Sequence, residues 1–599
     1  MFSRMTVFTK LLIVGLILGG VYFGFRKAAE TGLIPTPGIM QALIPQKAVL
    51  PDLQETKQEG NIVAVPMPSS TQASVSSTGI RFAIWEWNAQ MGLLFANGGA
   101  KTTQGSLMEK HGVNLYLYRQ DDTSKMMEEL ITCAKELHDG AKQCSAGANA
   151  AIIMGDGAGQ FAAAVNPQLE KLGPQYKVAV IGSVGYSRGE DALLAEPEVK
   201  SNPKALLGAL VEGVLRDGDW NIALNFEGAN GLKNNPDEKT WDPDAVNWVN
   251  ASDYNVAAAD YVAGKCEDRK VVKNGHPTGE TKHVCVNAVV TWTPGDVTIV
   301  HQKGGLVKIV SSKEYRSQMP AVILGPRKFF EDNRQEVMHM LAAIFEGGDQ
   351  VKAHDTILKK ASEISATVYA DQDASYWYRY YKGVVETDRQ GNKVELGGST
   401  VNNLADNLVL FGLMPGTNDN FKSTYTTFAN IAVQQYPNIF KDTPIPDVRD
   451  VEDKSFITGA QALMSDSGAV ADMPTYEKEK ERGEVISQRS YAINFNTGSA
   501  ILSRNGIKQL NELKDSLALN GLFIKIDGYT DNVGSENINV PLSYARAMAI
   551  QEFLQRSAPK NFPDNRFHVQ GHGSQNPMAS NKTAEGRALN RRVQITLGQ

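Results

Sequence analysis

The chain has little of what several classes of protein depend on. Its 599 residues include only four cysteines, too few for a scaffold that disulfides hold together in place of a hydrophobic core. The net charge of −6 gives no basic excess, which argues against a protein whose main task is to bind nucleic-acid phosphates. A hydrophobic fraction of 42% is ordinary for globular proteins, so the length predicts several folded domains.

Sequence motifs of common enzymes are also scarce. The sequence contains no Walker phosphate loop, no HExxH zinc motif and no GxGxxG turn after a predicted strand, and each of these motifs carries a specific chemistry. The nine histidines are scattered along the chain and show no metal-ligand spacing. We therefore expect a binding or structural protein, not an enzyme, and we expect no cofactor and no metal.

One long apolar run lies near the N-terminus. Residues 11–25 carry no charge and lie between Lys10 and the pair Arg26 and Lys27. Counted from Val7, the run approaches the ~20 apolar residues of a membrane-spanning helix. A cleaved signal peptide would end in small residues, which Phe25-Arg26-Lys27 does not provide, and a core helix would have a polar face. We favour an uncleaved signal-anchor helix over about residues 8–25 in an anchor segment 1–27. The flanking charges do not decide its orientation.

The rest of the chain divides by composition into four parts. Residues 28–79 are rich in Pro and Ser and predict an extended tether. Residues 80–465 alternate strand-like and helix-like stretches, which is typical of α/β domains, and their number is too large for one core. We expect two lobes there. Residues 466–487 are polar and charged and predict a linker, and residues 488–599 predict a separate compact domain.

Within the large α/β region the apolar patterns predict individual elements. The predicted strands are 81–85, 113–118, 150–155, 177–182 and 221–226. The predicted helices are 126–137, 204–215, 333–345 and 356–364.

The cysteines form two pairs that are close in sequence. Cys133 lies near Cys144, and Cys266 lies near Cys285. Two such pairs fit two short disulfide loops in an oxidising compartment, whereas four free cysteines would fit a cytosolic protein. We favour the disulfides.

The C-terminal region shows a mixed α/β pattern. Two charged residues in it are of interest, one just after a predicted strand and one on a predicted helix. Strands are predicted at 491–495, 523–529, 566–571 and 592–597, with helices over about 503–518 and 541–555. Asp531 follows a predicted strand between Gly528 and Gly534, and Arg546 lies 15 residues later on a helix. By spacing alone, two such charges are more often unrelated surface groups than one site.

Two segments of this region carry a family resemblance. GYTDNVGSENINVPLSYARAMAIQEFL (528–554) and GHGSQNPMASNKTAEGRALNRRVQI (571–595) resemble the OmpA-like peptidoglycan-binding domain of outer-membrane protein A, related lipoproteins and flagellar stator proteins. The resemblance covers about residues 488–597 and implies a small α+β fold that binds without hydrolysing.

The resemblance also implies which residues bind the cell wall. Asp531 and Arg546 would grip diaminopimelate of the stem peptide, whose free end carries an ammonium and a carboxylate on one carbon. One anionic and one forked cationic side chain suit that pair of charges. Asn539 would add an amide contact and Arg591 would face a stem carboxylate. Gly498 departs from the polar residue of several relatives, and Arg587 and Asn590 are expected to brace the fold.

The large region is similar to the two-lobed substrate-binding proteins of ABC uptake systems, more narrowly to the nitrate, sulfonate and thiamine-precursor type. The features that carry this similarity are FAIWEWNAQMGLLFANG (82–98), DDTSKMMEEL (121–130), VVTWTP (289–294) and the segment 319–347. Such folds hold a ligand between lobes, and the sequence leaves open whether an anion or an amine is bound. Candidate ligand contacts, each of which could also be a core or surface residue, are Trp85, Trp87, Asp156, Tyr186, Ser187, Arg188, Asp191, Asp219 and Trp292.

These resemblances together predict a periplasmic protein of a Gram-negative bacterium. Its partners would be peptidoglycan, a small solute, the inner membrane and an ABC permease or other envelope protein, with no nucleic acid. In the leading hypothesis the two-lobed domain captures or senses the solute. The alternative is an envelope scaffold or signalling component whose two-lobed domain docks a protein partner.

Overall fold

The computed structural model describes residues 62–598, apart from 78, 236, 274, 466–467, 477–484, 492, 494 and 496–497. The predicted anchor helix over about 8–25 and the tether up to residue 61 therefore lie outside the described residues. Among the helices that are described, none has both the length and the apolar character needed to cross a membrane. The predicted anchor stays a prediction.

A mixed six-stranded sheet forms the first lobe, in the strand order β16-β4-β13-β3-β1-β2. β1 pairs in parallel with β2 and β3, whereas β13 runs antiparallel to β3 and β4. Every residue of β3 and β13 is buried, as expected for central strands that helices cover on both faces. The strand bounds are β1 Ile80–Ile84, β2 Leu115–Arg119, β3 Ala150–Met154, β4 Val178–Ser187, β13 Pro320–Pro326 and β16 Ser399–Val401.

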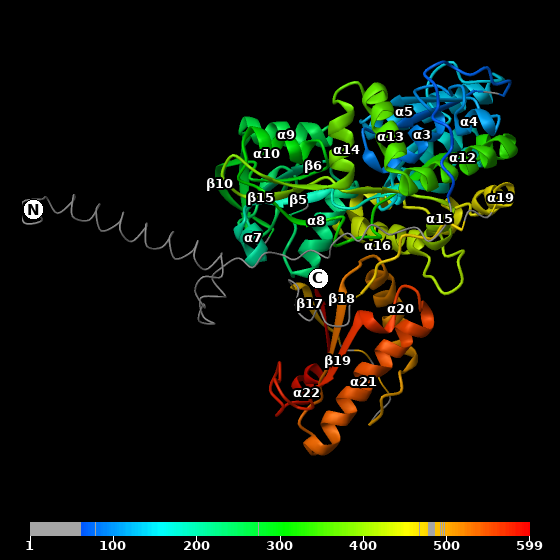
Figure 1. Cartoon of the computed structure of the whole chain (residues 1–599). Helices are drawn as coiled ribbons and strands as arrows, with labels where there is room; N and C mark the ends of the chain where they lie inside the picture. The colour runs from blue at the N-terminus through cyan, green and yellow to red at the C-terminus, as the bar shows by residue number, and fades with distance from the viewer. Residues whose placement is uncertain are drawn as a thin grey trace, which may run out of the picture. The chain divides into compact units, whose positions relative to one another are not determined.

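Helices from both ends of the middle region pack around this sheet (Figure 1). α12 packs against α3, α13 against α14, and α16 against α6. The helix bounds are α3 Met91–Asn97, α4 Leu107–Lys110, α5 Thr123–His138, α6 Ala158–Leu169, α11 Arg327–Asp332, α12 Arg334–Ala353, α13 Asp355–Tyr369, α14 Ala374–Lys382, α15 Leu404–Leu410, α16 Asn420–Gln435, α17 Pro437–Asp442, α18 Val448–Val451 and α19 Ser455–Leu463.

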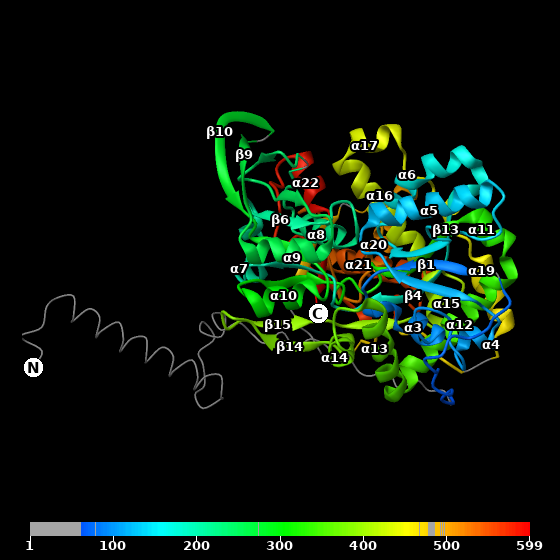
Figure 2. The same cartoon turned by 90° about the horizontal axis from the view of Figure 1, so that it is seen from above.

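The second lobe is built on a five-stranded sheet in the order β12-β5-β11-β6-β8. Helices α9 and α10 lie side by side, and α9 contacts β11 (Figure 2). The chain passes between the two sheets twice, through residues 188–191 and 312–319. The bounds are β5 Ala192–Ala195, α7 Glu198–Ser201, β6 Leu210–Gly213, α8 Gly218–Ala229, β8 Asn247–Asn250, α9 Tyr254–Ala263, β11 Ala288–Thr291, α10 Gly295–Gln302 and β12 Val307–Ser311.

Two smaller strand groups complete the middle region. The long antiparallel hairpin of β9 and β10 joins β7 in a three-stranded sheet, and β14 pairs with β15. The bounds are β7 Thr240–Trp241, β9 Cys266–Lys273, β10 His276–Cys285, β14 Val384–Thr387 and β15 Lys393–Leu396.

Two of the predicted elements are wrong. Residues 221–226, predicted as a strand, belong to helix α8, whose N-terminus is capped by the side chain of Asp217. Residues 204–215, predicted as a helix, form a 3-10 turn (Pro203–Leu206) and strand β6, with Gly208 at a φ of 79° between them. Both segments are buried apolar runs, and periodicity alone does not separate a buried strand from a buried helix. The predicted strands of the first lobe and helices α5, α12 and α13 are present.

Part of the predicted tether is bonded to the first lobe. The side chain of Gln350 on α12 donates to the carbonyl of Val63 at 3.0 Å and accepts from the backbone N–H of Val65 at 3.1 Å. Residue 72 forms a bridge with residue 103. Residues 62–77 therefore lie along the first lobe.

The C-terminal domain is a four-stranded sheet in the order β17-β20-β18-β19. Helix α21 packs on β18 and β19 and contacts α20 (Figure 1). Three details differ from the predicted elements. The first strand, β17, ends at Tyr491, where the predicted strand 491–495 begins; α21 begins at Glu536 instead of at Pro541; and a short helix α22 precedes the last strand. The bounds are β17 Val485–Tyr491, α20 Arg504–Ala518, β18 Phe523–Gly528, α21 Glu536–Ser557, β19 Phe567–Gly571, α22 Ala584–Asn590 and β20 Val593–Gly598.

Both predicted disulfides are present. Cys133, near the end of α5, is bonded to Cys144, and Cys266 is bonded to Cys285 at the base of the β9–β10 hairpin. Cys133 and Cys144 are buried, whereas most of β10 is exposed. The first disulfide therefore holds a loop against the core of the first lobe.

Removing the Cys133–Cys144 disulfide should destabilise the middle region. A disulfide that closes a loop of this size restricts the unfolded chain by about 3 kcal/mol, so C133A/C144A should unfold at lower urea concentration. All seven tryptophans lie between residues 85 and 377, so tryptophan fluorescence follows this region alone. Wild type with a reducing agent is the control, and an unchanged midpoint would contradict the expectation.

Candidate binding sites

Close packing at two strand ends positions the candidate site of the C-terminal domain. The parallel strands β18 and β19 end side by side at Gly528 and Gly571. A Cβ on Gly528 would lie 2.1 Å from the carbonyl oxygen of Ser543, and one on Gly571 would lie 2.6 Å from the backbone nitrogen of Tyr544. Glycine at both ends therefore lets α21 lie directly on the strand ends. Asp531 follows β18 at this edge.

The carboxylate of Asp531 is held by several contacts. Asp531 is buried, and its Oδ1 accepts from the backbone N–H of Val533 at 3.0 Å. Its Oδ2 accepts from Nη1 of Arg591 at 2.6 Å. The side-chain amide of Asn539, also buried, lies 3.4 Å from the Asp531 carbonyl oxygen. The acid is thus fixed in place, with an arginine paired to it.

Arg546 reaches the same place from α21. Its Nε donates to the carbonyl of Ser499 at 3.1 Å, and its guanidinium lies 5.2 Å from the ring centroid of Phe495. Partial burial and the positive charge of Arg591 lower the pKa of Arg546, and the negative charge of Asp531 opposes them. Asp531, Arg546 and Arg591 therefore share one electrostatic environment with a net charge of about +1, which suits a ligand that carries a carboxylate.

A second candidate site lies where the strands of both lobes end. Trp85 and Trp87 follow β1 and Asp156 follows β3 in the first lobe, while Asp219 starts α8 in the second lobe and Asp191 lies in the crossing segment 188–191. All are at most 1% exposed. Ligand sites of α/β sheets lie outside the carboxyl ends of the strands. We call Asp156, Asp191 and Asp219 the inter-lobe acidic cluster.

Few hydrogen-bond donors contact the carboxyl groups of the inter-lobe acidic cluster. Oδ2 of Asp156 accepts from Gln318 at 3.0 Å. Oδ1 of Asp156 and all four carboxylate oxygens of Asp191 and Asp219 have no partner of good geometry among the described residues. Burial raises the pKa of Asp156 to about 8 and that of Asp191 to about 6, and it raises the pKa of Asp219 well above its usual range. The negative charges of neighbouring carboxylates add to each of these increases.

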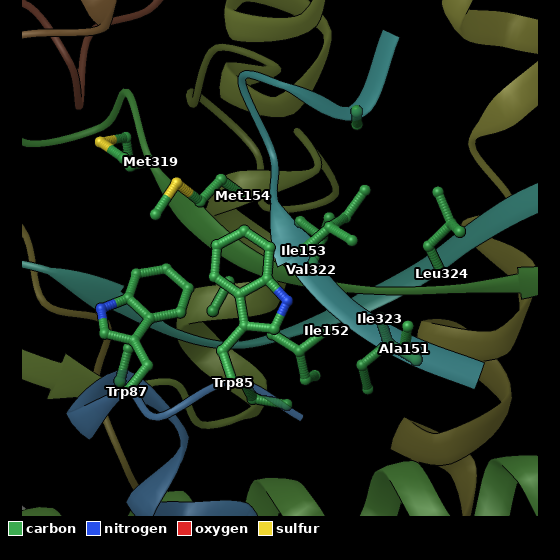
Figure 3. Packing of buried hydrophobic residues seen from close by; sticks show 14 of the residues in the cluster. Trp85, Trp87, Ala151, Ile152, Ile153, Met154, Met319, Val322, Ile323 and Leu324 are labelled. Atoms are coloured by element: carbon green, nitrogen blue, oxygen red, sulfur yellow. The ribbon is translucent and has the colours of Figure 1, made fainter. Parts of the chain in front are cut away.

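Aromatic rings from both lobes stand beside these acids. The ring centroid of Trp292, which follows β11, lies 5.2 Å from that of Trp85 and 4.7 Å from that of Tyr254. Trp85 lies 6.2 Å from Tyr254, and the charges of all three clustered aspartates act on the Tyr254 hydroxyl. We call Trp85, Tyr254 and Trp292 the aromatic wall. Figure 3 shows the rings of Trp85 and Trp87 near the Met154 end of β3.

A cavity of about 400 Å³ adjoins the aromatic wall. It is lined by residues of both lobes, among them Trp85, Thr123 and Met154 of the first and Asp217 and Asn250 of the second. Its lining also includes Met154 and Gly157, which stand on either side of Asp156 in the sequence, so the cavity lies near the first-lobe member of the acidic cluster.

Comparison with known proteins shows what the C-terminal domain is similar to. Residues 494–591 match the OmpA family. The peptidoglycan-binding protein ArfA of Mycobacterium bovis is 42% identical over 106 residues, which are 18% of this chain and 32% of ArfA. The putative lipoprotein YfiB of Escherichia coli is 34% identical over 129 residues, which are 21% of this chain and 79% of YfiB.

The chain belongs to the OmpA family through its C-terminal domain. The chain spans only about a third of the length of ArfA, so the family membership covers this domain and not the whole protein.

A larger part of the chain is similar to another solved structure, that of the periplasmic nitrate-binding protein NrtA from Synechocystis. The similarity covers 66% of this chain and 93% of NrtA, at 11% identity and a TM-score of 0.44.

Two residues of the OmpA-family domain brace the fold, as predicted. The side chain of Asn590 makes hydrogen bonds in both directions with the backbone of Ala579 and donates to Asn581. Arg587 donates to the carbonyl of Asn581 at 2.9 Å. Asn539 holds the Asp531 backbone, so its contact with a ligand stays a prediction. Gly498 has a φ of 64° and open space around it.

The polar loop after β4 is used differently from the prediction. The Ser187 hydroxyl lies 2.6 Å from that of Ser312, and the two crossing segments are thereby joined. The guanidinium of Arg188 lies 4.2 Å from the ring centroid of Tyr186 and 3.6 Å from Asp472. Residues 185–189 read Gly-Tyr-Ser-Arg-Gly, the pattern of a hydrolase nucleophile elbow, but Ser187 is the last residue of a regular strand and pairs with Ser399.

Sequence reasoning missed two residues near these sites. Tyr254 begins α9 and completes the aromatic wall, but a single tyrosine carries no signal of that position. Asp472, in the predicted linker, pairs with Arg316 as well as Arg188, and its backbone N–H donates to Asp406. Although burial opposes ionisation, the two arginines hold the pKa of Asp472 below its usual range.

The raised pKa of Asp156 predicts a specific pH dependence of stability. Since this buried acid takes up a proton on folding between about pH 4 and 8, wild type should lose stability as pH rises through that window. Relative to wild type, D156N should gain about 1.4 kcal/mol per pH unit there. Tryptophan-monitored urea unfolding at pH 5, 6 and 7 measures this. The exposed D139N is the control, and a pH-independent difference for D156N would refute the expectation.

Proposed function

We propose that the protein is a cell-envelope protein that binds peptidoglycan through its OmpA-family domain, while its two-lobed region captures or senses a small solute. The observation that carries the first half is the meeting of Asp531, Arg546 and Arg591 at the strand ends of this domain. The name of the relative ArfA, a peptidoglycan-binding protein, supports the same assignment.

The chemistry of the site fits the free end of diaminopimelate. That end carries an ammonium and a carboxylate on one carbon. Asp531 is held rigidly by Val533 and Arg591 and would accept hydrogen bonds from the ammonium. Arg546, which is partly buried, would donate to the carboxylate through its forked N–H groups. Arg591 would then be shared between Asp531 and the ligand, so that binding requires no large rearrangement of the pocket.

The second half of the proposal rests on the two lobes. Two sheets joined by two crossing segments can move towards each other about those segments, and a ligand bound to both lobes favours the closed arrangement. The inter-lobe acidic cluster and the aromatic wall draw residues from both lobes, so a solute held there would contact both. Delivery to an ABC permease is one outcome of such capture, and a signalling output is another.

The location of the protein follows from the same argument. Peptidoglycan binding and two disulfides both favour the periplasm. With the predicted N-terminal anchor, the chain would join the inner membrane of a Gram-negative cell to its wall.

Charge-removing variants of the OmpA-family site test the proposal. D531N and R546Q should each lose most co-sedimentation of the full-length protein with purified sacculi. Each variant removes one of the two charges that would pair with the ammonium and the carboxylate of the ligand. R556Q is the matched control, since Arg556 lies on the same helix and pairs with Glu552 at the surface. R591Q should weaken binding less. Wild-type pelleting of both D531N and R546Q would defeat the proposal.

A further inference from the structure

The three carboxyl groups of the inter-lobe acidic cluster have fewer hydrogen-bond partners among the described residues than their oxygens can accept. Asp191 and Asp219 are fully buried and adjacent, and their four oxygens lack donors of good geometry there. A buried carboxylate without a partner is costly, and it is neutralised either by a proton, as the raised pKa of Asp219 indicates, or by a cation that also donates hydrogen bonds.

The nearby cationic side chains are engaged elsewhere. Lys308 pairs with Asp296 at 2.8 Å and donates to the carbonyl of Gly189. Arg188 is turned towards Asp472 and the carbonyl of Arg316. The positive charge of Lys308 acts on Asp191, but neither Lys308 nor Arg188 forms an ion pair with Asp191 or Asp219 in the described part of the chain.

We propose that the inter-lobe acidic cluster and the aromatic wall bind a small organic cation that carries N–H groups, such as an amine or a guanidinium compound. This inference rests on the proposed capture of a solute between the lobes and names its chemical class. The carboxylates supply acceptors for the N–H groups, and the faces of Trp85, Tyr254 and Trp292 attract the positive charge.

Two further observations narrow the class. Nε1 of Trp87 and Nε1 of Trp292 are buried donors without an acceptor among the described residues, so the solute is expected to carry an oxygen acceptor as well. A bare metal ion fits less well, because in the described part of the chain the only group of three His, Cys, Asp or Glu ligand atoms within 4.8 Å of one another belongs to Cys266, His283 and Cys285, and these two cysteines are bonded to each other. The clustered aspartates do not converge on one point in that way.

The cation must enter by separation of the lobes. Asp156, Asp191, Asp219, Trp87 and Trp292 are 0% exposed, so the arrangement seen here is closed around them. The cavity lined by Trp85 and Asp217 adjoins them and marks the side from which a solute would arrive.

Thermal unfolding of the full-length protein, followed by tryptophan fluorescence, tests this inference. The cationic probes are ethanolamine, agmatine, putrescine and arginine, and choline is the matched cation without N–H groups. Nitrate, sulfate and ethanesulfonate are the anionic probes, and Mg²⁺ and Ca²⁺ are the metal probes, all at equal ionic strength. We expect a concentration-dependent rise in Tm with at least one N–H cation, a smaller rise with choline and none with the anions.

Variants of the cluster link the response to these residues. D191N/D219N should abolish the rise in Tm, while its ligand-free Tm should equal or exceed that of wild type because two facing acids are removed. The exposed D139N should respond as wild type does. An N–H cation response that persists in D191N/D219N would overturn the assignment to this cluster.

The remaining outcomes separate this inference from the proposed function. A rise in Tm with an anion or a metal alone would overturn the organic cation and leave solute capture standing. No response to any probe would count against both the cation and the capture of a solute. Sedimentation with sacculi is independent of either result.

Discussion

A carboxylate that is removed from water has to be compensated, and this requirement shapes both candidate sites. Asp531 is compensated within the chain, by Arg591 and by the backbone N–H of Val533. Asp191 and Asp219 are buried more deeply and have no such partners among the described residues. The first arrangement is complete within the chain. The second depends on protons or on a cation that is not part of the chain.

Strand ends provide the position of both sites. In the OmpA-family domain, β18 and β19 end together, and glycine at both ends allows α21 to approach closely enough to bring Arg546 near Asp531. Between the lobes, residues after β1 and β3 of one sheet meet residues after β6 and β11 of the other. A rigid sheet fixes where each strand ends, so short segments beyond it can hold charged groups accurately.

The sequence was sufficient for most elements with a clear periodic pattern, and it placed Asp531 after a strand and Arg546 on a helix, where the structure has them. It was insufficient for segments that are buried on every side. Residues 221–226 look like a strand because Ile222, Leu224 and Phe226 alternate, yet the cap provided by Asp217 makes them a helix. Pro541 suggested a helix start, but α21 begins five residues earlier and contains Pro541 in its second turn, where the ring removes the N–H that would bond to the carbonyl of Asn537.

The candidate residues between the lobes show a different limit. Asp156, Asp191, Asp219, Trp85, Trp87 and Trp292 could be proposed because the region resembles two-lobed binding proteins, which hold a ligand with a few aromatic and charged residues. Their meeting across two lobes depends on tertiary contacts between segments more than a hundred residues apart, as the Trp85–Trp292 contact shows. No local pattern reveals that Arg188 turns away from them, because its partner Asp472 lies in a segment that reads as a polar linker.

The contact of Asp472 with Arg188 and Arg316 has a mechanical consequence. Arg188 and Arg316 belong to the two segments that cross between the lobes, and Asp472 lies on the stretch of backbone that continues to the OmpA-family domain. A protein held at its far end by a stiff external network carries load along its backbone. If the OmpA-family domain is held by peptidoglycan, as proposed, tension along this backbone would act on a partly buried ion pair that joins both crossing segments. The proposed closure of the lobes would act on the same few atoms.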